Sequence, residues 1–475
     1  MEVEEFRNQG HKLVDWMADY MENISEYPVK SQVRPGEIMA KLQELPPENG
    51  EKFEEIMRDF EENIMPGITH WQSPSFFAYF PAASSAPSVL AEMLTATIGA
   101  QCMVWETSPA AAEMEERVME WLKKMMKLPT GWSGVIQDTA STATLVALLT
   151  ARQKLIKPDV NSHGFPANKF RAYCSNQAHS SVDKAVRMAG IGSENLIKIE
   201  VDENYAMRPD KLTEAIENDI QMGFTPLFVV GAIGTTGSTA IDPVDEIGEI
   251  CQQFDCWFHI DAAYAGTAFI LNDFRSKFKK LELADSFVFN PHKWMFTNFD
   301  CSAYFVKNKA DLIDTFSLTP EYLKTRDEGS VNNYKDWGIQ LGRRFRALKL
   351  WIVIRSFGVS EIKKRIQEHI DIGQWFANQV KKHPDFELLA PVPLNTVCFR
   401  FNPEHEKLSK VQLNDLNERI MHTINDSGAI YFTHTILDGK FTLRIVTGQS
   451  NVKKEHVENA WEIIKKTAES INYQS

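Results

Sequence analysis

The sequence predicts an α/β fold with a mainly parallel sheet, and three short apolar segments carry this prediction. Amphipathic stretches with helical spacing, such as PVDEIGEICQQFD, separate the three segments. Apolar strands that alternate with such helices are typical of a parallel sheet covered on both faces. The segments are LFVVGAIG (227–234), CWFHID (256–261) and DSFVFN (285–290).

Polar residues follow each of these predicted strands. Ligands of open α/β sheets bind beyond the carboxyl ends of the strands, so we expect a ligand site at this edge. The candidate residues at the edge are Thr235, Thr236, Asp261 and Lys293.

The flanking segments predict two further parts of the chain. Residues 1–85 begin with the helical pattern FRNQGHKLVDWMADYME and contain too little apolar sequence for a core of their own. Residues 351–475 read as strand, helix, hairpin and helix, with Asp438-Gly439 in the hairpin turn. We therefore predict a helical N-terminal extension that packs on a partner subunit, a large α/β domain over 86–350, and a small α+β domain over 351–475.

Composition excludes several classes of function. The 475 residues are 43% apolar and 24% charged, with a formal net charge of −13, which argues against a nucleic-acid-binding or polybasic membrane surface. No apolar run approaches the roughly 18 residues of a membrane helix. The six cysteines form no CxxC pair, HExxH is absent, and the acidic start MEVEEFRNQG differs from a signal peptide. We expect a cytoplasmic protein with reduced thiols and no metal site.

Lys293, in FNPHKWMF, is the candidate nucleophile. A lone lysine is more often a surface residue or a counter-charge for phosphate. Asp261 changes this interpretation, because an acid at the end of a buried strand is costly unless it is paired. Pyridoxal phosphate requires both groups, a lysine for its aldehyde and an acid that keeps its ring nitrogen protonated. For Asp261 alone, a turn or cap residue is an equally good interpretation.

Two further segments fit the same cofactor. GVIQDTASTATLVALLTARQKLI passes from a strand into a helix, and the N–H groups and hydroxyls of residues 138–142 suit an anion at the helix start. A plain N-cap is the simpler interpretation of this segment taken alone. His179, in SNQAHSSVDKA, is placed between a strand and a helix, where it could stack on a cofactor ring and contact a substrate carboxylate. A lone histidine is more often structural.

The whole chain resembles the pyridoxal-phosphate-dependent group II decarboxylases, and among them the aromatic L-amino acid decarboxylases. The motifs that carry the resemblance are THWQSPSFFAYFPAASS, SNQAHSSVDKA, GAIGTTGS, HIDAAYAG, NPHKW, PEYLK and LGRRFRALKLW. The combination of HIDAAYAG with NPHKW at this spacing is more specific than any single motif. The resemblance implies the fold type I architecture of pyridoxal-phosphate-dependent transferases, bound pyridoxal 5'-phosphate and a homodimer.

The resemblance also implies roles for single residues. Lys293 would bind the cofactor aldehyde, Asp261 would pair with the pyridine nitrogen, and His179 would stack on the ring. Tyr322 would donate a proton to the substrate after carbon dioxide leaves, whereas Tyr334 is expected to be structural. The remaining cofactor-binding residues would be Thr236, Ala140, Ser141, Asn290, His292 and Ala263. The substrate-binding residues would be Trp71, Tyr79, Phe80, Pro81, Ala82, Gln101, Met103 and Gly342.

The resemblance predicts decarboxylation of tryptophan, 5-hydroxytryptophan, dopa, tyrosine or phenylalanine to the arylalkylamine. Related aromatic acetaldehyde synthases typically carry Phe at the position of Tyr322 or Asn at that of His179, and this chain keeps both decarboxylase residues. An acetaldehyde synthase, a group II decarboxylase for another amino acid and a catalytically inactive scaffold nevertheless stay open as functions. Gly342, where phenol-selective relatives often have Ser, favours a bulky ring.

Four residues depart from the pattern of animal relatives. Near the expected substrate, Ala82 replaces a threonine, and Gln101 and Met103 replace larger or purely apolar side chains. Near the expected phosphate, Asp138 replaces a glycine. A buried glutamine requires a hydrogen-bonding partner, and the charge of Asp138 would repel phosphate unless it acts as a cap. The choice of substrate therefore depends on positions at which this chain differs from the family.

Overall fold

The computed structural model describes residues 1–475 except 158, 167–168, 319–329, 404–407 and 472–475. The chain divides into two compact units. Unit 1 consists of Met1–Pro81, Ile372–Leu389 and Val397–Ser475, and unit 2 consists of Ala82–Asp371 and Ala390–Thr396. The predicted boundaries at residues 85 and 350 remain a prediction. No helix among the described residues is long and apolar enough to cross a membrane.

Unit 2 is built on a seven-stranded sheet in the order β1-β7-β6-β5-β4-β2-β3. Its strands are β1 Ser133–Gln137, β2 Lys169–Ser175, β3 Leu196–Ile199, β4 Phe224–Ala232, β5 Trp257–Asp261, β6 Ser286–Phe289 and β7 Ser302–Val306. The neighbours β3, β2, β4, β5 and β6 run parallel, whereas β7 is antiparallel to both β1 and β6. The mainly parallel sheet and its three predicted strands are confirmed.

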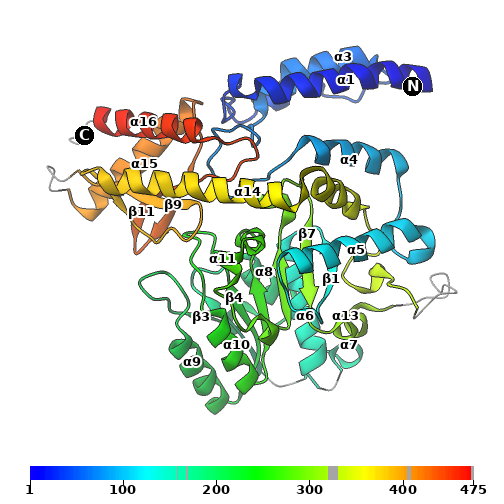
Figure 1. The fold of residues 1–475 in the computed structure, drawn as a ribbon, viewed down its shortest axis with the longest axis vertical. Coiled ribbons are helices and arrows are strands. Elements are labelled where there is room, and N and C mark those ends of the chain that lie inside the picture. Colours follow the sequence, from blue (N-terminus) through cyan, green and yellow to red (C-terminus); the bar gives the residue numbers. More distant parts are fainter. Residues whose placement is uncertain (158, 167–168, 319–329, 404–407, 472–475) are drawn as a thin grey trace. The chain divides into compact units, whose positions relative to one another are not determined.

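Helices cover both faces of this sheet. The α-helices of unit 2 are α4 Ala86–Ile98, α5 Pro109–Met125, α6 Ala140–Leu155, α7 Val160–His163, α8 Ser181–Met188, α9 Pro209–Gln221, α10 Val244–Gln253, α11 Asn272–Arg275, α12 Pro291–Trp294, α13 Lys309–Phe316 and most of α14 Arg346–Lys382. Phe228 and Val230 of β4 share one buried cluster with α6 and α8. A Cβ on Gly231, which faces the other way, would meet Val244 of α10. Both faces of β4 are therefore buried, and α9 and α10 lie side by side next to it (Figure 1).

Unit 1 joins the N-terminal segment to the last quarter of the chain. It contains the helices α1 Val3–Asn23, α2 Glu37–Lys41, α3 Phe53–Asp59, α15 Lys410–Asp426 and α16 Lys454–Ser470, and the strands β8 Phe386–Leu388, β9 Thr396–Phe401, β10 Thr433–Leu437 and β11 Lys440–Val446. The four strands form one sheet. The Phe77 N–H donates to the Tyr431 carbonyl at 2.7 Å, and the Val446 N–H donates to the Phe77 carbonyl at 3.0 Å. These bonds fix the N-terminal segment to the edge of the hairpin.

The predicted β10–β11 hairpin is confirmed, with its turn at Asp438-Gly439. Both turn residues have positive φ, 51° and 70°, which is the geometry that a two-residue turn requires between twisted strands. Asp tolerates this conformation better than most residues, and Gly adopts it without steric cost. The turn therefore fixes the register in which Leu437 pairs with Lys440.

Candidate active site

The strands β4, β5 and β6 have their carboxyl ends at the same edge of the sheet. Ala232 of β4 pairs with Asp261, the last residue of β5, and Asp261 pairs with Val288 of β6. The Ile233 N–H donates to the Asp261 carbonyl, and the Ala262 N–H donates to the Val288 carbonyl, each at 2.9 Å. This register brings together the segments that follow the three strands, as expected for a ligand site at a parallel sheet edge.

Lys293 lies in α12, a single helical turn that starts directly after β6. Its N–H donates to the Asn290 carbonyl at 3.0 Å. The next residue, Trp294, is fully buried, stacks on Tyr264 with a centroid distance of 4.8 Å, and donates its indole N–H to His369 Nδ1 at 2.9 Å. The buried aromatic neighbours therefore anchor the turn, and Lys293 itself is half-buried.

Asp261 and Lys293 both lie close enough to His179 to influence its charge. Partial removal from water lowers the pKa of His179, Asp261 opposes this effect, and Lys293 adds to it. The Ser181 N–H donates to His179 Nδ1 at 3.1 Å. Because a main-chain N–H can only donate, the neutral ring carries its proton on Nε2. His179 is therefore neutral at pH 7, and Nε2–H is available as a donor.

The start of α6 presents main-chain N–H groups. Thr139 is the N-cap, and its side chain accepts a hydrogen bond from the Thr142 N–H at 3.4 Å. The Asp138 carboxylate accepts from the Thr139 N–H at 2.5 Å, so it folds back onto the helix start as a local cap. Among the described residues, nothing accepts from the N–H groups of Ala140 and Ser141. These two positions fit a phosphate.

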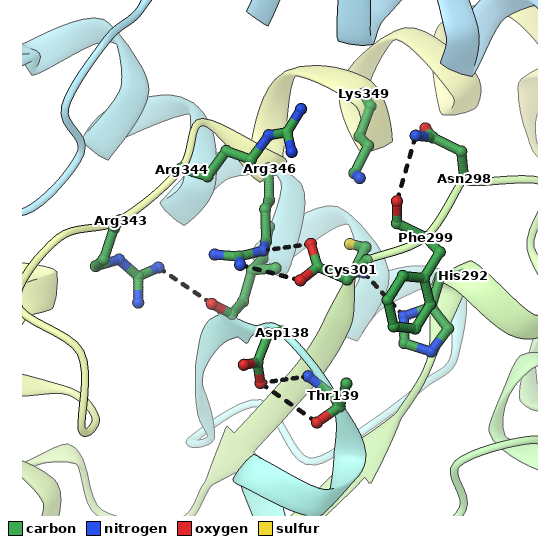
Figure 2. A network of polar contacts seen from close by, with 12 residues as sticks. Asp138, Thr139, His292, Asn298, Phe299, Cys301, Arg343, Arg344, Arg346 and Lys349 are labelled. Atoms are coloured by element: carbon green, nitrogen blue, oxygen red, sulfur yellow. Dashed lines mark hydrogen bonds and ion pairs between the residues drawn. The ribbon is translucent and has the colours of Figure 1, made fainter. Parts of the chain in front are cut away.

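His292 and Asn290 add two donors beside α12. The Cys301 N–H donates to His292 Nδ1 at 2.8 Å (Figure 2). Burial lowers the pKa of His292 to about 3, and Lys293 contributes in the same direction. The ring is therefore neutral with its proton on Nε2, which can donate to an anion. The Ser302 hydroxyl donates to Asn290 Oδ1 at 2.7 Å, which orients the amide so that its NH₂ group is the other end.

The turn after β4 presents Thr236 and buries Thr235. Gly234 has φ of 87°, and a Cβ there would lie 2.7 Å from the Cβ of Ala265, so only glycine fits. The Thr235 hydroxyl accepts from the Ala240 N–H at 3.0 Å and stabilises the turn. Thr236 is exposed at its tip. Of the two threonines at the predicted edge, Thr236 is therefore the one available to a ligand, whereas Thr235 is structural.

Ala263 connects the acid to the lysine segment. Its N–H donates to Asp261 Oδ1 at 3.0 Å, and its carbonyl accepts from the Asn290 N–H at 3.0 Å. The first bond fixes one oxygen of the Asp261 carboxylate, and the second fixes the start of α12.

The predicted substrate-binding residues divide between the two units. Trp71, Tyr79, Phe80 and Pro81 belong to unit 1, and Ala82, Gln101, Met103 and Gly342 belong to unit 2. In unit 1, Trp71 stacks on Tyr79 with a centroid distance of 5.5 Å, and both rings are partly exposed. Arg444 holds this segment by donating to the Tyr79 carbonyl at 2.6 Å and by covering the Phe80 ring.

The resemblance implies different roles for Tyr322 and Tyr334. Tyr322 lies outside the described residues. Tyr334 is 2% exposed and packs on Trp337 with a centroid distance of 5.2 Å, while the Arg343 guanidinium lies 5.1 Å from its ring. Burial raises the pKa of Tyr334 well above 10. This environment fits the structural role expected for Tyr334.

Several residues that hold the site were missed in the sequence. Ser181 orients His179, Ser302 orients Asn290, and His369 anchors Trp294. Arg346 of α14 makes a two-point ion pair with Asp300, at 2.9 and 3.1 Å, next to the Cys301 N–H that orients His292. Figure 2 shows the Arg346 side chain beside Cys301. Only the LGRRFRALKLW motif gave a signal, and it assigned no role to Arg346.

Taken together, the site has a lysine beyond a strand, an acid at the neighbouring strand end, and donors for an anion at a helix start. This combination fits pyridoxal phosphate, with Lys293 for the aldehyde, Asp261 for the ring nitrogen and the Ala140 and Ser141 N–H groups for the phosphate. The geometry defines a pyridoxal-phosphate-dependent enzyme of fold type I.

Comparison with known proteins identifies the family. Residues 35–402 match the pyridoxal-dependent decarboxylase conserved domain, so the chain belongs to the pyridoxal-dependent decarboxylases. It is 43% identical to the aromatic-L-amino-acid decarboxylase of Rattus norvegicus, over 99% of each chain. It is 41% identical to the phenylacetaldehyde synthase of Arabidopsis thaliana, over 98% of this chain and 96% of that protein. The structure of Catharanthus roseus tryptophan decarboxylase in complex with L-tryptophan matches with a TM-score of 0.93 and 36% identity, over 99% of each chain.

Proposed function

We propose that this protein decarboxylates aromatic L-amino acids to the corresponding arylalkylamines and carbon dioxide, with pyridoxal phosphate as cofactor. The observation that carries the proposal is the grouping of Lys293, Asp261 and His179 at one sheet edge, in a chain of this decarboxylase family. Relatives over nearly the full length include an aromatic-L-amino-acid decarboxylase and a tryptophan decarboxylase.

The residues of the site divide the chemistry between them. When bound, pyridoxal phosphate supplies an electron sink for the electron pair left by departing carbon dioxide. Asp261 would keep a proton on the ring nitrogen of the bound cofactor. His179 would lie against the ring, with its Nε2–H available to the substrate carboxylate. Lys293 would hold the cofactor through its aldehyde.

The Ala140 and Ser141 N–H groups would hold the phosphate, with His292 Nε2 and the Asn290 amide as further donors. Thr236 would lie near the ring hydroxyl, and the Ala263 N–H fixes the Asp261 carboxylate. Tyr322, outside the described residues, protonates the substrate carbon after decarboxylation, a step to which a positioned acid contributes about 10²–10⁴-fold. The candidate residues for the aromatic ring of the substrate in unit 2 are Ala82, Gln101, Met103 and Gly342. For the unit 1 residues Trp71, Tyr79, Phe80 and Pro81, the same role is a separate prediction from the family resemblance.

An aromatic acetaldehyde synthase is the second candidate, because such an enzyme is among the relatives at 41% identity. The presence of both His179 and Tyr322 favours the amine product over the aldehyde. A group II decarboxylase for another amino acid is the third candidate.

We also propose a cytoplasmic homodimer. Helix α1 buries only Gln9 within unit 1 and exposes Val3, Phe6, Val14 and Met21 by 40–74%. Helix α4 of unit 2 exposes Leu90, Met93, Leu94 and Ile98 by 38–60%. Helices with several exposed apolar side chains are typical of an interface between subunits. Light scattering should give twice the mass of 54.2 kDa, and a fully active monomer would refute the dimer.

Product analysis tests the proposed function. The purified holoenzyme is incubated with tryptophan, 5-hydroxytryptophan, dopa, tyrosine, phenylalanine and histidine, and the amine, aldehyde and hydrogen peroxide are quantified. We expect amine from the aromatic set without peroxide. Aldehyde with peroxide would establish the synthase instead, and no product from any of the six would refute an aromatic substrate.

The Lys293→Ala variant tests the cofactor site in a separate experiment. We expect the visible absorbance of the lysine-bound cofactor to disappear, because the covalent bond to the lysine is lost. Lys277→Ala removes an exposed lysine and serves as the control with unchanged absorbance. A spectrum that survives Lys293→Ala would exclude this lysine as the attachment point.

A further inference from the structure

The segment over residues 101–105 holds the main chain over residues 333–343 at several points. The Cys102 N–H donates to the Arg343 carbonyl at 3.0 Å, and the Lys335 N–H donates to the Met103 carbonyl at 2.9 Å. The Trp105 N–H donates to the Asn333 side chain at 3.0 Å. The two segments therefore form one connected structure, and this structure includes Gly342.

The side chain of Gln101 contacts the main chain directly after Gly342. Its Oε1 accepts a hydrogen bond from the Arg343 N–H at 2.6 Å. A Cβ atom on Gly342 would lie 3.3 Å from Gln101 Nε2, which is closer than ordinary van der Waals contact. The glutamine amide therefore both fixes the main chain after Gly342 and limits the space next to it.

The position of Arg343 is fixed independently on its other side. Its guanidinium is buried, pairs with Glu115 at 2.5 Å, and donates to the Ile136 carbonyl at 3.2 Å. The buried ion pair holds the side chain of Arg343, and the Cys102 N–H holds its carbonyl. The Gln101 bond is the contact made by the N–H of the peptide before Arg343, and it therefore orients that peptide. That peptide contains the Gly342 carbonyl.

We propose that Gln101 is a specificity-determining positioning residue, which sets the room for the substrate ring at Gly342 by holding the Gly342–Arg343 main chain. The inference rests on the proposed function, because it assigns Gly342 to the substrate ring. Without the glutamine amide, the Gly342–Arg343 main chain relaxes into the room for the substrate ring. The value of kcat/KM then falls more for a substrate with a two-ring indole than for one with a one-ring phenol.

The test compares kcat/KM for tryptophan and tyrosine in Gln101→Leu, Gln101→Glu and wild type. Gln101→Leu has a similar size but no acceptor, whereas Gln101→Glu keeps an acceptor for the Arg343 N–H. We expect Gln101→Leu to lower the tryptophan-to-tyrosine ratio about fivefold, the factor that one hydrogen bond typically supplies. Gln101→Glu should keep the ratio within about twofold of wild type. Gln252→Leu, the same change at an exposed position of α10, is the control.

A double-mutant cycle with Gly342→Ser gives the second measurement. A serine side chain would meet the Gln101 amide, so the effect of Gly342→Ser on the ratio should differ at least threefold between the wild-type and Gln101→Leu backgrounds. Equal losses for both substrates in Gln101→Leu would mean a merely structural role and would overturn the proposal. Independent effects in the cycle would overturn it too.

The outcome remains distinguishable from a failure of the proposed function. If the wild-type holoenzyme forms no amine, the proposed function fails. The dissociation constants of tryptophan and tyrosine, measured by calorimetry on the same variants, then decide the role of Gln101. An unchanged ratio of these constants in Gln101→Leu would refute the inference on its own.

Discussion

At the scale of single residues, the chain contains a buried acid that the proposed chemistry does not use. Asp242 is 1% exposed, and its two oxygens accept from the Met207 and Ala232 N–H groups, each at 2.7 Å. It thereby ties the end of β4 to the turn at Val201–Met207. Burial raises the pKa of Asp242 to about 7, although the two N–H groups oppose this shift.

Asp242→Asn is expected to lower the free energy of unfolding by about 1–3 kcal/mol, because an amide can accept only one of the two main-chain hydrogen bonds. The effect should depend on pH. A carboxyl whose folded pKa is raised contributes stability below its unfolded pKa, and this stability is lost as pH rises toward 7. Asparagine does not titrate, so the difference from wild type should be larger at pH 5 than at pH 8.

Urea unfolding of both proteins at the two pH values measures this prediction. Asp245→Asn is the matched control, since Asp245 also accepts from two main-chain N–H groups, those of Lys279 and Lys280. An equal difference at pH 5 and pH 8 would show that Asp242 does not titrate between them.

At the scale of elements, α12 shows how a single helical turn can be held in place. It is too short for its own hydrogen bonds to stabilise it, so its position depends on Trp294 and the contacts that Trp294 makes with His369 and Tyr264. Trp294→Phe keeps an aromatic ring but removes the indole N–H. We expect cofactor affinity to fall about three- to tenfold, because one buried hydrogen bond that positions Lys293 is lost.

Equilibrium titration of the apoprotein with pyridoxal phosphate measures that affinity. Trp351→Phe, the same change in α14 at a half-buried position, is the control. If both variants bound the cofactor equally well, the indole N–H would have no part in placing Lys293.

The elements also show what could be predicted from the sequence. The strands β4, β5 and β6 were found because continuous apolar runs mark strands buried on both faces. Asp261 was predicted as a site residue because it ends such a run, and Lys293 was predicted because it follows one closely. His369 could not be found, since it lies 75 positions from Trp294 and the two meet only through tertiary packing.

The partner of Gln101 was hidden for a different reason. The sequence analysis treated Gln101 as a buried glutamine that requires a partner. In the structure Gln101 is exposed, and its partner is the main-chain N–H of Arg343, a group that every residue except proline carries. Similarly, His292 is oriented by the Cys301 N–H, and the side-chain type at position 301 gives no sign of this. Sequence patterns therefore predicted candidate residues for the site, which remain a prediction, but they did not predict the main-chain groups that orient these residues.

At the scale of the whole molecule, the stability of unit 2 should depend on three histidines kept neutral by burial. Burial lowers the pKa of His259 to about 4, and those of His292 and His369 to about 3. An unfolded chain binds a proton at each of them near pH 6.5, whereas the folded chain does not. Stability is therefore present above pH 6.5 and is lost as pH falls toward the folded pKa values.

The slope of this loss can be estimated from proton counts. Between about pH 6 and pH 4, unfolding takes up about three protons at the histidines and releases about one from Asp242, whose folded pKa is raised. A net uptake of about two protons corresponds to about 2.7 kcal/mol lost per pH unit. Urea unfolding at pH 7, 6 and 5 should show a loss of about 1 kcal/mol in the first step and about twice that loss in the second. His369→Gln removes one titrating group and should reduce the slope by about 1.4 kcal/mol per unit, and an unchanged slope would mean that His369 is protonated in the folded protein.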